Sequence, residues 1–322
     1  MARISASLVF GFATFAVLTY SIMIWYPYTE AVVGRQSSGK PSYRLIAQSV
    51  IDRYTALHKN RTDYVKAQCD RHRKELPKME KTPILLVNEK YKLVYCQTPK
   101  AGTDSWCKLF LVLSGYKSYT EVLKMNVMNV SAAWKKHVPK LSQFTPAKQR
   151  YILSNYTKIM IVRNPLTRLL SAFNDKAVAK NKSDYNLSFQ RQLSKQILQD
   201  FRTGNVSGQY DPTFNEFIRM IVSTESINNI HWRNMHQICF PCDIKYDIIG
   251  RFEHIEDDSN YILRLVGSDI RFPKSTGTHF TNSSHRAKIK QGYAKIPRSD
   301  MKSIYRKYKL DFLLFGYEQE IP

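Results

Sequence analysis

One stretch of the chain, YCQTPKAGTDSW at residues 95–106, places a lysine, a glycine and small polar residues directly after an apolar run. Lys100 offers a mobile positive charge, and Gly102 lets the main chain approach an oxyanion closely. Thr103 and Ser105 supply hydroxyl donors. The spacing differs from G-x-x-x-x-G-K-[ST], and the sequence shows no separate acidic strand end to hold Mg²⁺. We therefore expect a phosphate-binding loop that does not serve nucleoside-triphosphate hydrolysis.

A second stretch of the same kind follows at residues 157–176, TKIMIVRNPLTRLLSAFNDK. Arg163 ends a buried-strand pattern, and Arg168 and Ser171 stand on the first turns of the following helix. In an open α/β sheet, ligands bind beyond the carboxyl ends of strands, where helix N-termini present N–H groups and a positive dipole end. Two anion-binding sites of this kind suit a ligand that carries a phosphate at each end.

The ordered pair TPKAGTDSW and VRNPLTRLLSAFNDK resembles the donor-binding signature of Golgi carbohydrate sulfotransferases. That family includes the HNK-1 and the chondroitin and dermatan 4-O-sulfotransferases. HWRNMHQICFPCDIKYDIIGRFEHIEDDSNYILRLVG at 231–267 and YKLDFLLFGYE near the C-terminus are similar to the same family, so the resemblance covers about residues 84–318. The chondroitin 4-O-sulfotransferase branch is the nearest. The resemblance implies 3'-phosphoadenosine 5'-phosphosulfate, PAPS, as the donor, and no metal.

The resemblance also implies site residues. The first loop would wrap the 5'-phosphosulfate, and the second would hold the 3'-phosphate, mainly through Arg163 and Ser171. The acceptor hydroxyl would attack sulfur in line, and Lys100 would neutralise the leaving phosphate oxygen. The predicted donor-binding residues are Pro99, Lys100, Ala101, Gly102, Thr103, Asp104, Ser105, Arg163, Arg168 and Ser171.

Three positions depart from the family pattern. Asp104 stands where the family has a threonine, and a carboxylate facing a phosphate would repel it. Either this side chain points away from the donor or donor affinity is reduced. Asn164 replaces an acidic residue after the arginine, and Cys107 replaces a basic residue on the first helix. Lys100, Arg163 and Ser171 remain, so we still expect activity.

A general base must reach the acceptor hydroxyl, and imidazole suits a neutral or mildly acidic lumen. His231 is a candidate through its His-Trp context, and His137 through its place between the two loops. Glu253 is a third candidate. An ordinary surface or hydrogen-bonded role is the alternative for each of them.

His231, His236, Cys239 and Cys242 together make a possible zinc ligand set, and Cys-X-X-Cys also occurs in redox sites. In an oxidising lumen, a structural disulfide that involves these cysteines is the favoured interpretation. The five cysteines of the chain suit one or two disulfides and a leftover thiol.

The elements that must position these residues alternate between strand and helix. Strands are predicted around a turn at Asn88, at 159–162 and in IKYDIIGRFE, and helices in DSWCKLFLVL, PLTRLLSAFNDK, FNEFIRMIV, EDDSNYILRLVG and a terminal segment from Arg298. This pattern predicts an α/β fold with a mainly parallel sheet covered by helices on both faces. The resemblance implies a P-loop-like sulfotransferase fold.

An uncharged apolar run at residues 4–26 is long enough to span a membrane, and aromatic residues at its end suit an interface. A cleaved signal peptide is the alternative. Positive charges after the run favour a cytoplasmic domain, but seven Asn-X-Ser/Thr sequons favour a secretory lumen. We expect a cytosolic tail at 1–3, a signal anchor at 4–26, a stem at 27–80 and a lumenal domain at 81–322.

The net charge of +23 indicates a polyanionic partner. The basic run at 285–309, in which Tyr293, Tyr305 and Tyr308 are interleaved, would suit a glycosaminoglycan. Nucleic acid could use the same features, but the anchor and the sequons argue against it.

The sequence therefore predicts a single-pass Golgi membrane enzyme that moves sulfate from PAPS to a glycosaminoglycan, at the 4-position of N-acetylgalactosamine in chondroitin. One alternative is a different acceptor, either an HNK-1-type glycan or N-acetylgalactosamine on a glycoprotein. Another is a catalytically silent glycan-binding membrane protein, which Asp104 and Cys107 would suit. A membrane-anchored nucleotide kinase would need a magnesium site, which the sequence does not show.

Overall fold

A computed structural model of the chain describes residues 48–178, 184–202, 211–223, 229–273 and 286–321. The tail and anchor expected at 1–26 lie outside these residues. In the described part, no helix has the length and apolar character needed to cross a membrane.

A four-stranded sheet with the order β1-β2-β3-β4 lies at the centre of the domain, and its strands are β1 Leu85–Asn88, β2 Leu93–Cys96, β3 Thr157–Val162 and β4 Ile248–Arg251. β2, β3 and β4 are parallel to one another, while β1 pairs antiparallel with β2. The short link between β1 and β2 permits only a hairpin, since parallel neighbours need a long crossover. The predicted α/β class is confirmed, with an antiparallel edge on the mainly parallel sheet.

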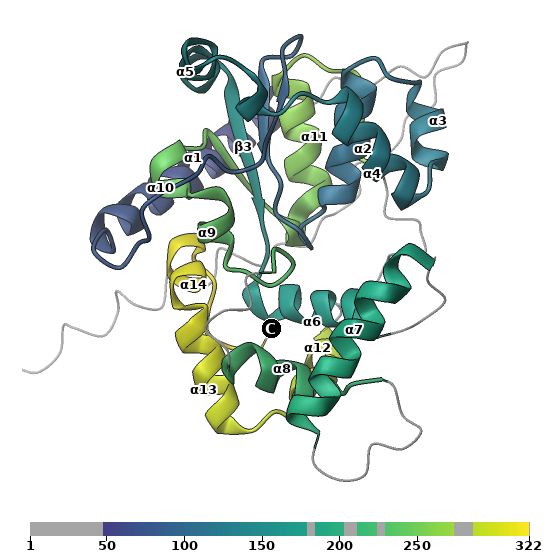
Figure 1. Cartoon of the computed structure of the whole chain (residues 1–322). Helices are drawn as coiled ribbons and strands as arrows, with labels where there is room; N and C mark the ends of the chain where they lie inside the picture. Colours follow the sequence, from purple (N-terminus) through teal and green to yellow (C-terminus); the bar gives the residue numbers. More distant parts are fainter. Residues whose placement is uncertain (1–47, 179–183, 203–210, 224–228, 274–285, 322) are drawn as a thin grey trace, which may run out of the picture. The chain divides into compact units, whose positions relative to one another are not determined.

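Helices cover the sheet and extend beyond one of its ends (Figure 1). They are α1 Gln48–Arg71, α2 Thr103–Leu113, α3 Tyr119–Lys124, α4 Val127–His137, α5 Pro146–Asn155, α6 Pro165–Lys176, α7 Asp184–Phe201, α8 Phe214–Ser223, α9 Met235–Cys239, α10 Pro241–Ile244, α11 Ile255–Leu265, α12 Arg286–Tyr293, α13 Arg298–Lys307 and α14 Lys309–Phe315. Two 3₁₀ turns, η1 Leu141–Gln143 and η2 Phe252–His254, complete the described elements.

The sheet is buried on both faces because successive strand side chains point to opposite sides. Leu93 and Tyr95 of β2 pack in one core with α2, α4 and α11. Val94 and Cys96 of the same strand pack in a second core with α1, α9 and α14. A third core joins α6, α7, α8, α12 and α13 beyond the end of the sheet (Figure 1).

Helix α1 lies within the segment expected as a stem, and it packs on the folded domain. Its Val65 and Cys69 are buried, and Cys69 forms a disulfide with Cys242. Arg61 donates from Nη1 to Oδ2 of the fully buried Asp258 at 2.6 Å. The compact part of the chain therefore includes residues well before position 81.

The terminal segment expected as one helix is two helices, α13 and α14, which meet at Tyr308. The Tyr308 ring is buried, and its hydroxyl donates to the carbonyl of Trp232. The buried Asp311 accepts hydrogen bonds from the main-chain N–H groups of Met235 and His236. These long-range bonds fix the direction of α14, which no local pattern encodes.

Candidate active site

The two sequence motifs meet at one edge of the sheet. β2 ends at Cys96 and β3 ends at Val162, and the two strands run parallel. The loops that follow them therefore leave the sheet at the same edge, where α2 and α6 begin (Figure 1). Ligands of open α/β sheets bind at such a place, since the helix N-termini there present unpaired N–H groups.

The first loop makes a tight turn around Gly102, whose φ of +81° favours glycine. A Cβ at this position would lie 2.1 Å from Cδ1 of Ile255 at the start of α11. Thr103 Oγ1 donates to the carbonyl of Thr98 at 2.6 Å, and Ala101 N–H donates to the same carbonyl at 3.1 Å. The turn is thus held by its own hydrogen bonds.

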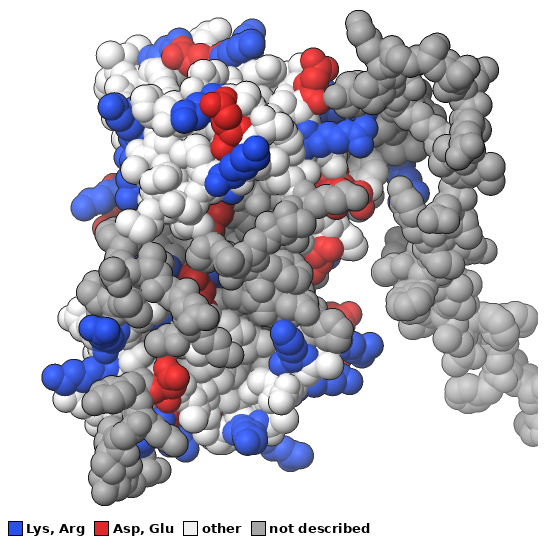
Figure 2. All heavy atoms as spheres, turned by 90° about the vertical axis from the view of Figure 1, so that its right-hand side faces the viewer, with Lys and Arg blue, Asp and Glu red and all other residues white. Residues whose placement is uncertain are grey.

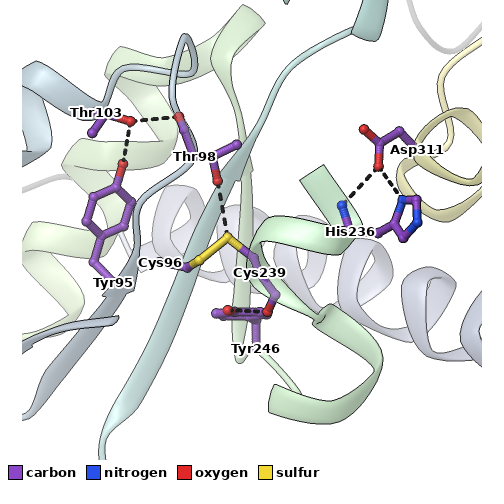
Figure 3. The surroundings of a disulfide bond; sticks show 8 residues. All are labelled: Tyr95, Cys96, Thr98, Thr103, His236, Cys239, Tyr246 and Asp311. Atoms are coloured by element: carbon purple, nitrogen blue, oxygen red, sulfur yellow. Dashed lines mark hydrogen bonds and ion pairs between the residues drawn. A yellow bond between two sulfur atoms is a disulfide. The ribbon is translucent and has the colours of Figure 1, made fainter. Parts of the chain in front are cut away.

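A disulfide between Cys96 and Cys239 joins the end of β2 to α9, and Thr98 Oγ1 lies 3.4 Å from the Cys239 sulfur (Figure 3). Together with the Cys69–Cys242 bond, this places both cysteines of the Cys-X-X-Cys stretch in disulfides. The expected structural disulfides are confirmed, and the leftover thiol is Cys107. Sulfurs held in disulfides are not thiolate ligands, so the zinc interpretation fails.

His236, the fourth member of that set, lies on α9 with Nδ1 at 2.8 Å from Oδ1 of Asp311 (Figure 3). The described part of the chain contains no group of three or more His, Cys, Asp and Glu residues that could hold a metal ion.

Arg163 joins the second loop to the first. Its Nη1 donates to the carbonyl of Lys100 at 2.8 Å, and its Nε donates to Thr167 Oγ1 at 3.1 Å. Its guanidinium carbon lies 4.1 Å from the centre of the Phe252 ring. Burial lowers the pKa of Arg163 to about 10, and the nearby Glu253 opposes this shift, so the guanidinium is charged at neutral pH.

Arg168 makes a similar bridge. Its Nε donates to the carbonyl of Pro99 at 2.9 Å, and its Nη1 and Nη2 donate to the carbonyls of Arg233 and Ile230 at 2.7 and 3.1 Å. Burial lowers the pKa of Arg168. The two arginines therefore position the first loop through main-chain carbonyls, a role that the sequence did not predict. Donor binding by Arg163, Arg168 and the buried Ser171 stays a prediction.

The three departures from the family pattern have clear places. Asn164 caps α6, since its Oδ1 accepts from the N–H groups of Leu166 and Thr167 at 2.9 and 3.3 Å. Cys107 is buried on α2 and accepts from Gln97 Nε2 at 3.0 Å, and burial raises its pKa. Asp104 is exposed. Two of these residues thus contribute to local structure.

A cluster of charges lies beside Lys100. Lys100 Nζ is 3.2 Å from Asp175 Oδ2, and Lys176 Nζ is 3.1 Å from the same oxygen. Each of the three side chains is at most 16% exposed. Burial lowers the pKa of Lys100, and the carboxylates of Asp175 and then Asp104 oppose that shift.

His231 interacts electrostatically with this cluster. Burial lowers its pKa to about 3, and the charges of Lys176 and Lys100 act in the same direction. The ring is therefore neutral at neutral and mildly acidic pH. Its Nδ1 is buried and has no hydrogen-bond partner among the described residues. A neutral imidazole beside Lys100 has the form that a general base needs.

The other candidate bases lie differently. His137 is exposed at the end of α4, where its ring centre is 4.5 Å from that of Tyr116. Tyr116 follows the C-terminal end of α2, the opposite end from the first loop, so the structure does not bring His137 to Lys100. Glu253 uses both carboxylate oxygens, accepting from Asn164 N–H at 2.9 Å and from Tyr317 Oη at 2.8 Å.

Sequence reasoning missed Asp175 and Lys176 as members of the site, although both end the quoted second motif. The spacing between Ser171 and Asp175 was an available signal. Residues four apart lie on one face of a helix, so Asp175 lies on the same face of α6 as Ser171.

A sulfotransferase family model matches residues 83–318 of the chain. This chain belongs to the sulfotransferase family. It is accordingly an enzyme that uses a sulfate donor. The matched range agrees with the range of about 84–318 that the sequence motifs indicate.

Known relatives of this sulfotransferase are similar over much of its length. Carbohydrate sulfotransferase 9 of Homo sapiens is 32% identical over 238 residues, which cover 72% of this chain and 53% of that protein. Carbohydrate sulfotransferase 10 of Xenopus laevis is 29% identical over 282 residues, or 83% and 78% of the two chains. Carbohydrate sulfotransferase 11 of Rattus norvegicus is 29% identical over 323 residues, or 94% and 88%. No solved structure matches the chain significantly.

Proposed function

We propose that this sulfotransferase transfers the sulfuryl group of PAPS to a carbohydrate hydroxyl. The observation that carries the proposal is the position of Lys100, which follows the end of β2, precedes the start of α2 and acts electrostatically on the neutral His231. The relatives named as carbohydrate sulfotransferases support a carbohydrate as the acceptor. The donor carries anionic groups, which suit the lysines and helix N-termini of this edge.

The reaction assigns a role to each of two side chains. The acceptor hydroxyl oxygen attacks sulfur and forms a new S–O bond, while the bond between sulfur and the 5'-phosphate oxygen breaks. The electron pair of that bond stays on the phosphate oxygen, whose charge the Lys100 ammonium neutralises. The hydroxyl proton passes to His231, which burial and, after it, the positive groups nearby keep deprotonated in the donor-free enzyme.

The acceptor that we propose is chondroitin, with transfer to the 4-position of N-acetylgalactosamine. Support comes from the resemblance of the motifs and from basic side chains on α12, on α13 and between these helices. The exposed ones include Lys288, Lys290, Lys295, Arg298, Lys302 and Arg306. Helix α12 reaches the start of α6, since Tyr293 Oη donates to the carbonyl of Leu166 at 2.9 Å. A polyanion on this helix would therefore lie near the second loop.

Two of the three tyrosines of the same run have another role. Tyr293 and Tyr308 are 2% and 1% exposed, so they belong to the core and not to a glycan surface.

On the face shown in Figure 2, Lys and Arg side chains are spread around the surface with Asp and Glu among them. Contacts to a polyanion would thus be distributed over several elements.

We further propose a Golgi membrane location with the domain in the lumen. The two disulfides support an oxidising compartment. The sequon residues Asn60, Asn129 and Asn155 are exposed, as an acceptor of N-linked sugar must be.

Sulfate transfer tests the proposed function directly. The detergent-solubilised full chain is incubated with radiolabelled PAPS and desulfated chondroitin, beside a Lys100→Ala variant. We expect transfer by the wild type and a loss of at least a hundredfold in kcat for the variant, since one charged donor at an oxyanion contributes this much. Added chelator should leave the transfer unchanged.

Transfer to another glycan alone would reject chondroitin and keep the enzyme class. Glycan binding with neither transfer nor binding of 3'-phosphoadenosine 5'-phosphate, PAP, would favour the catalytically silent alternative. The charge of Asp104 near Lys100 is the observation that would explain that result.

A further inference from the structure

The buried cations of the site have unequal numbers of carboxylates near them. Glu253 acts electrostatically on Arg163, and Asp311 acts on Arg168, so a different carboxylate lies near each arginine. By contrast, Lys100 and Lys176 contact the same oxygen of one carboxylate, Asp175 Oδ2. The lysine pair therefore has one positive charge more than its local counter-ion supplies.

Asp104 neutralises little of this excess positive charge. It acts on Lys100, but its side chain is exposed to solvent, and water and salt screen an exposed charge strongly. The side chains of Asp175, Lys100 and Lys176 are 14 to 16% exposed, so their mutual attraction is screened less.

We propose that Lys176 is a second donor-binding cation and that Asp175 is the carboxylate which the two lysines exchange for the phosphosulfate of the donor. This inference rests on the proposed function. Both ammonium groups already contact one carboxylate oxygen, Asp175 Oδ2. The oxygens of a phosphate or of a sulfo group are also negatively charged, and they accept the same hydrogen bonds. A donor with two or more anionic oxygens can contact both lysines.

The placement of the cluster in the chain supports this role. Lys176 lies in the last turn of α6, the helix that begins at the second loop, whereas Lys100 lies in the first loop. A ligand that binds both lysines would therefore connect the two motifs. His231 lies near both ammonium groups, so the bound anion would also be close to the proposed base.

Asp175 is a positioning residue in this scheme, and Lys176 contacts the donor. The carboxylate keeps the two ammonium groups close together at a partly buried place, where they would otherwise repel each other. Donor binding then replaces one anion by another, so the site does not have to bring unpaired charges together at that moment.

Equilibrium binding of PAP to the full chain in detergent tests the proposal, with calorimetry as the readout. For Lys176→Met we expect roughly tenfold to a hundredfold weaker binding, because a hydrogen bond to a charged group is lost. Lys176→Arg keeps the charge and should restore most of the affinity. For Asp175→Asn we expect several-fold tighter binding, since a competing anion is removed. Lys66→Met, at an exposed position of α1, is the matched control and should bind PAP like the wild type.

Steady-state kinetics add a second readout that a merely structural role would not move. Lys176→Met should raise KM for PAPS with a smaller change in kcat, and near-ultraviolet circular dichroism should show native packing. Wild-type PAP affinity in Lys176→Met would overturn the role of Lys176. Unchanged or weaker binding in Asp175→Asn would overturn the exchange, and a loss of kcat there with PAP binding retained would make Asp175 a base instead.

The proposed function can fail separately from this inference. If the wild type binds no PAP and transfers no sulfate, both are refuted. If the wild type binds PAP and Lys100→Ala does not, while Lys176→Met and Asp175→Asn behave like the wild type, only the inference about the lysine pair is refuted.

Discussion

At the scale of single residues, the site depends on which charges neighbour His231. Burial lowers the pKa of this histidine to about 3, and the charges of Lys176 and Lys100 act in the same direction. A base with so low a pKa accepts a proton reluctantly. The anionic donor would offset the two lysine charges, so the pKa of His231 should rise when PAPS binds.

The pH dependence of transfer follows from this shift. In the free enzyme His231 is deprotonated above about pH 3, so kcat/KM for PAPS should not fall through protonation of His231 between pH 7 and pH 5. In the donor complex the pKa is higher, so the acid limb of kcat should lie at higher pH than that of kcat/KM. Steady-state rates measured from pH 5 to pH 8 check whether an acid limb appears in kcat while kcat/KM shows none that His231 causes.

Substitution distinguishes the two histidine candidates. We expect His231→Gln to lower kcat about 10²- to 10⁴-fold while PAP binding is retained. His137→Gln should keep the wild-type kcat, because the structure places His137 at the far end of α2. A normal kcat in His231→Gln, or a large loss in His137→Gln, would contradict this assignment.

At the scale of elements, loop geometry at the start of α2 determines where Lys100 lies. Gly102 combines a φ of +81° with a close approach to Ile255. Gly115 has a similar φ of +73° at the other end of α2, but no neighbouring atom lies within 4 Å of a Cβ there. Substitutions at the two glycines therefore distinguish the effect of backbone strain from the effect of steric contact.

We expect Gly102→Ala to destabilise the protein more than Gly115→Ala does. Both substitutions place alanine in the left-handed region at a cost of about 1–2 kcal/mol, and Gly102→Ala adds the contact with Ile255. The additional change Ile255→Val removes the contacting Cδ1 atom and should recover part of the difference. Denaturant unfolding of the wild type and the three variants measures the free energy of unfolding of each. Equal losses for the two alanine variants would exclude a steric role of Ile255.

At the scale of the whole molecule, α1 is part of the folded domain although it lies in the segment expected as a stem. Cys69 binds Cys242, Arg61 pairs with Asp258, and Lys309 pairs with Glu75 just beyond the helix. His58 of α1 also packs against the Tyr261 ring, with ring centres 4.9 Å apart. The contacts reach α10, α11 and α14, so α1 closes one side of the sheet.

Truncation at two positions tests this boundary. A chain that begins at residue 46 keeps α1 and should unfold at nearly the temperature of the full chain. A chain that begins at residue 81 loses α1 and the Cys69–Cys242 bond, and the loss of a native disulfide alone typically costs about 2–5 kcal/mol. We expect its melting temperature to fall by many degrees, and Cys242→Ser in this shorter chain avoids an unpaired thiol. Equal melting temperatures would show that α1 is dispensable.

The sequence by itself determined the local units of this protein. Apolar runs and turn residues placed β1, β2, β3, β4 and the helices that follow them, because hydrophobic period and chain breakers act over a few residues. The residue types of the two loops likewise indicated an anion site. Lys100 and Arg163 fall at the same sheet edge because parallel strands end together.

Only the tertiary structure decided which distant residues meet. It brought Asp175, Lys176 and His231 to Lys100, left His137 at the other end of α2, and gave Arg163 and Arg168 main-chain carbonyls to bind. It also chose the disulfide partners and packed α1 on the sheet. These contacts depend on how helices pack against the two faces of the sheet. Two segments that pack together but lie far apart in the chain carry no periodic sequence pattern that identifies the partner.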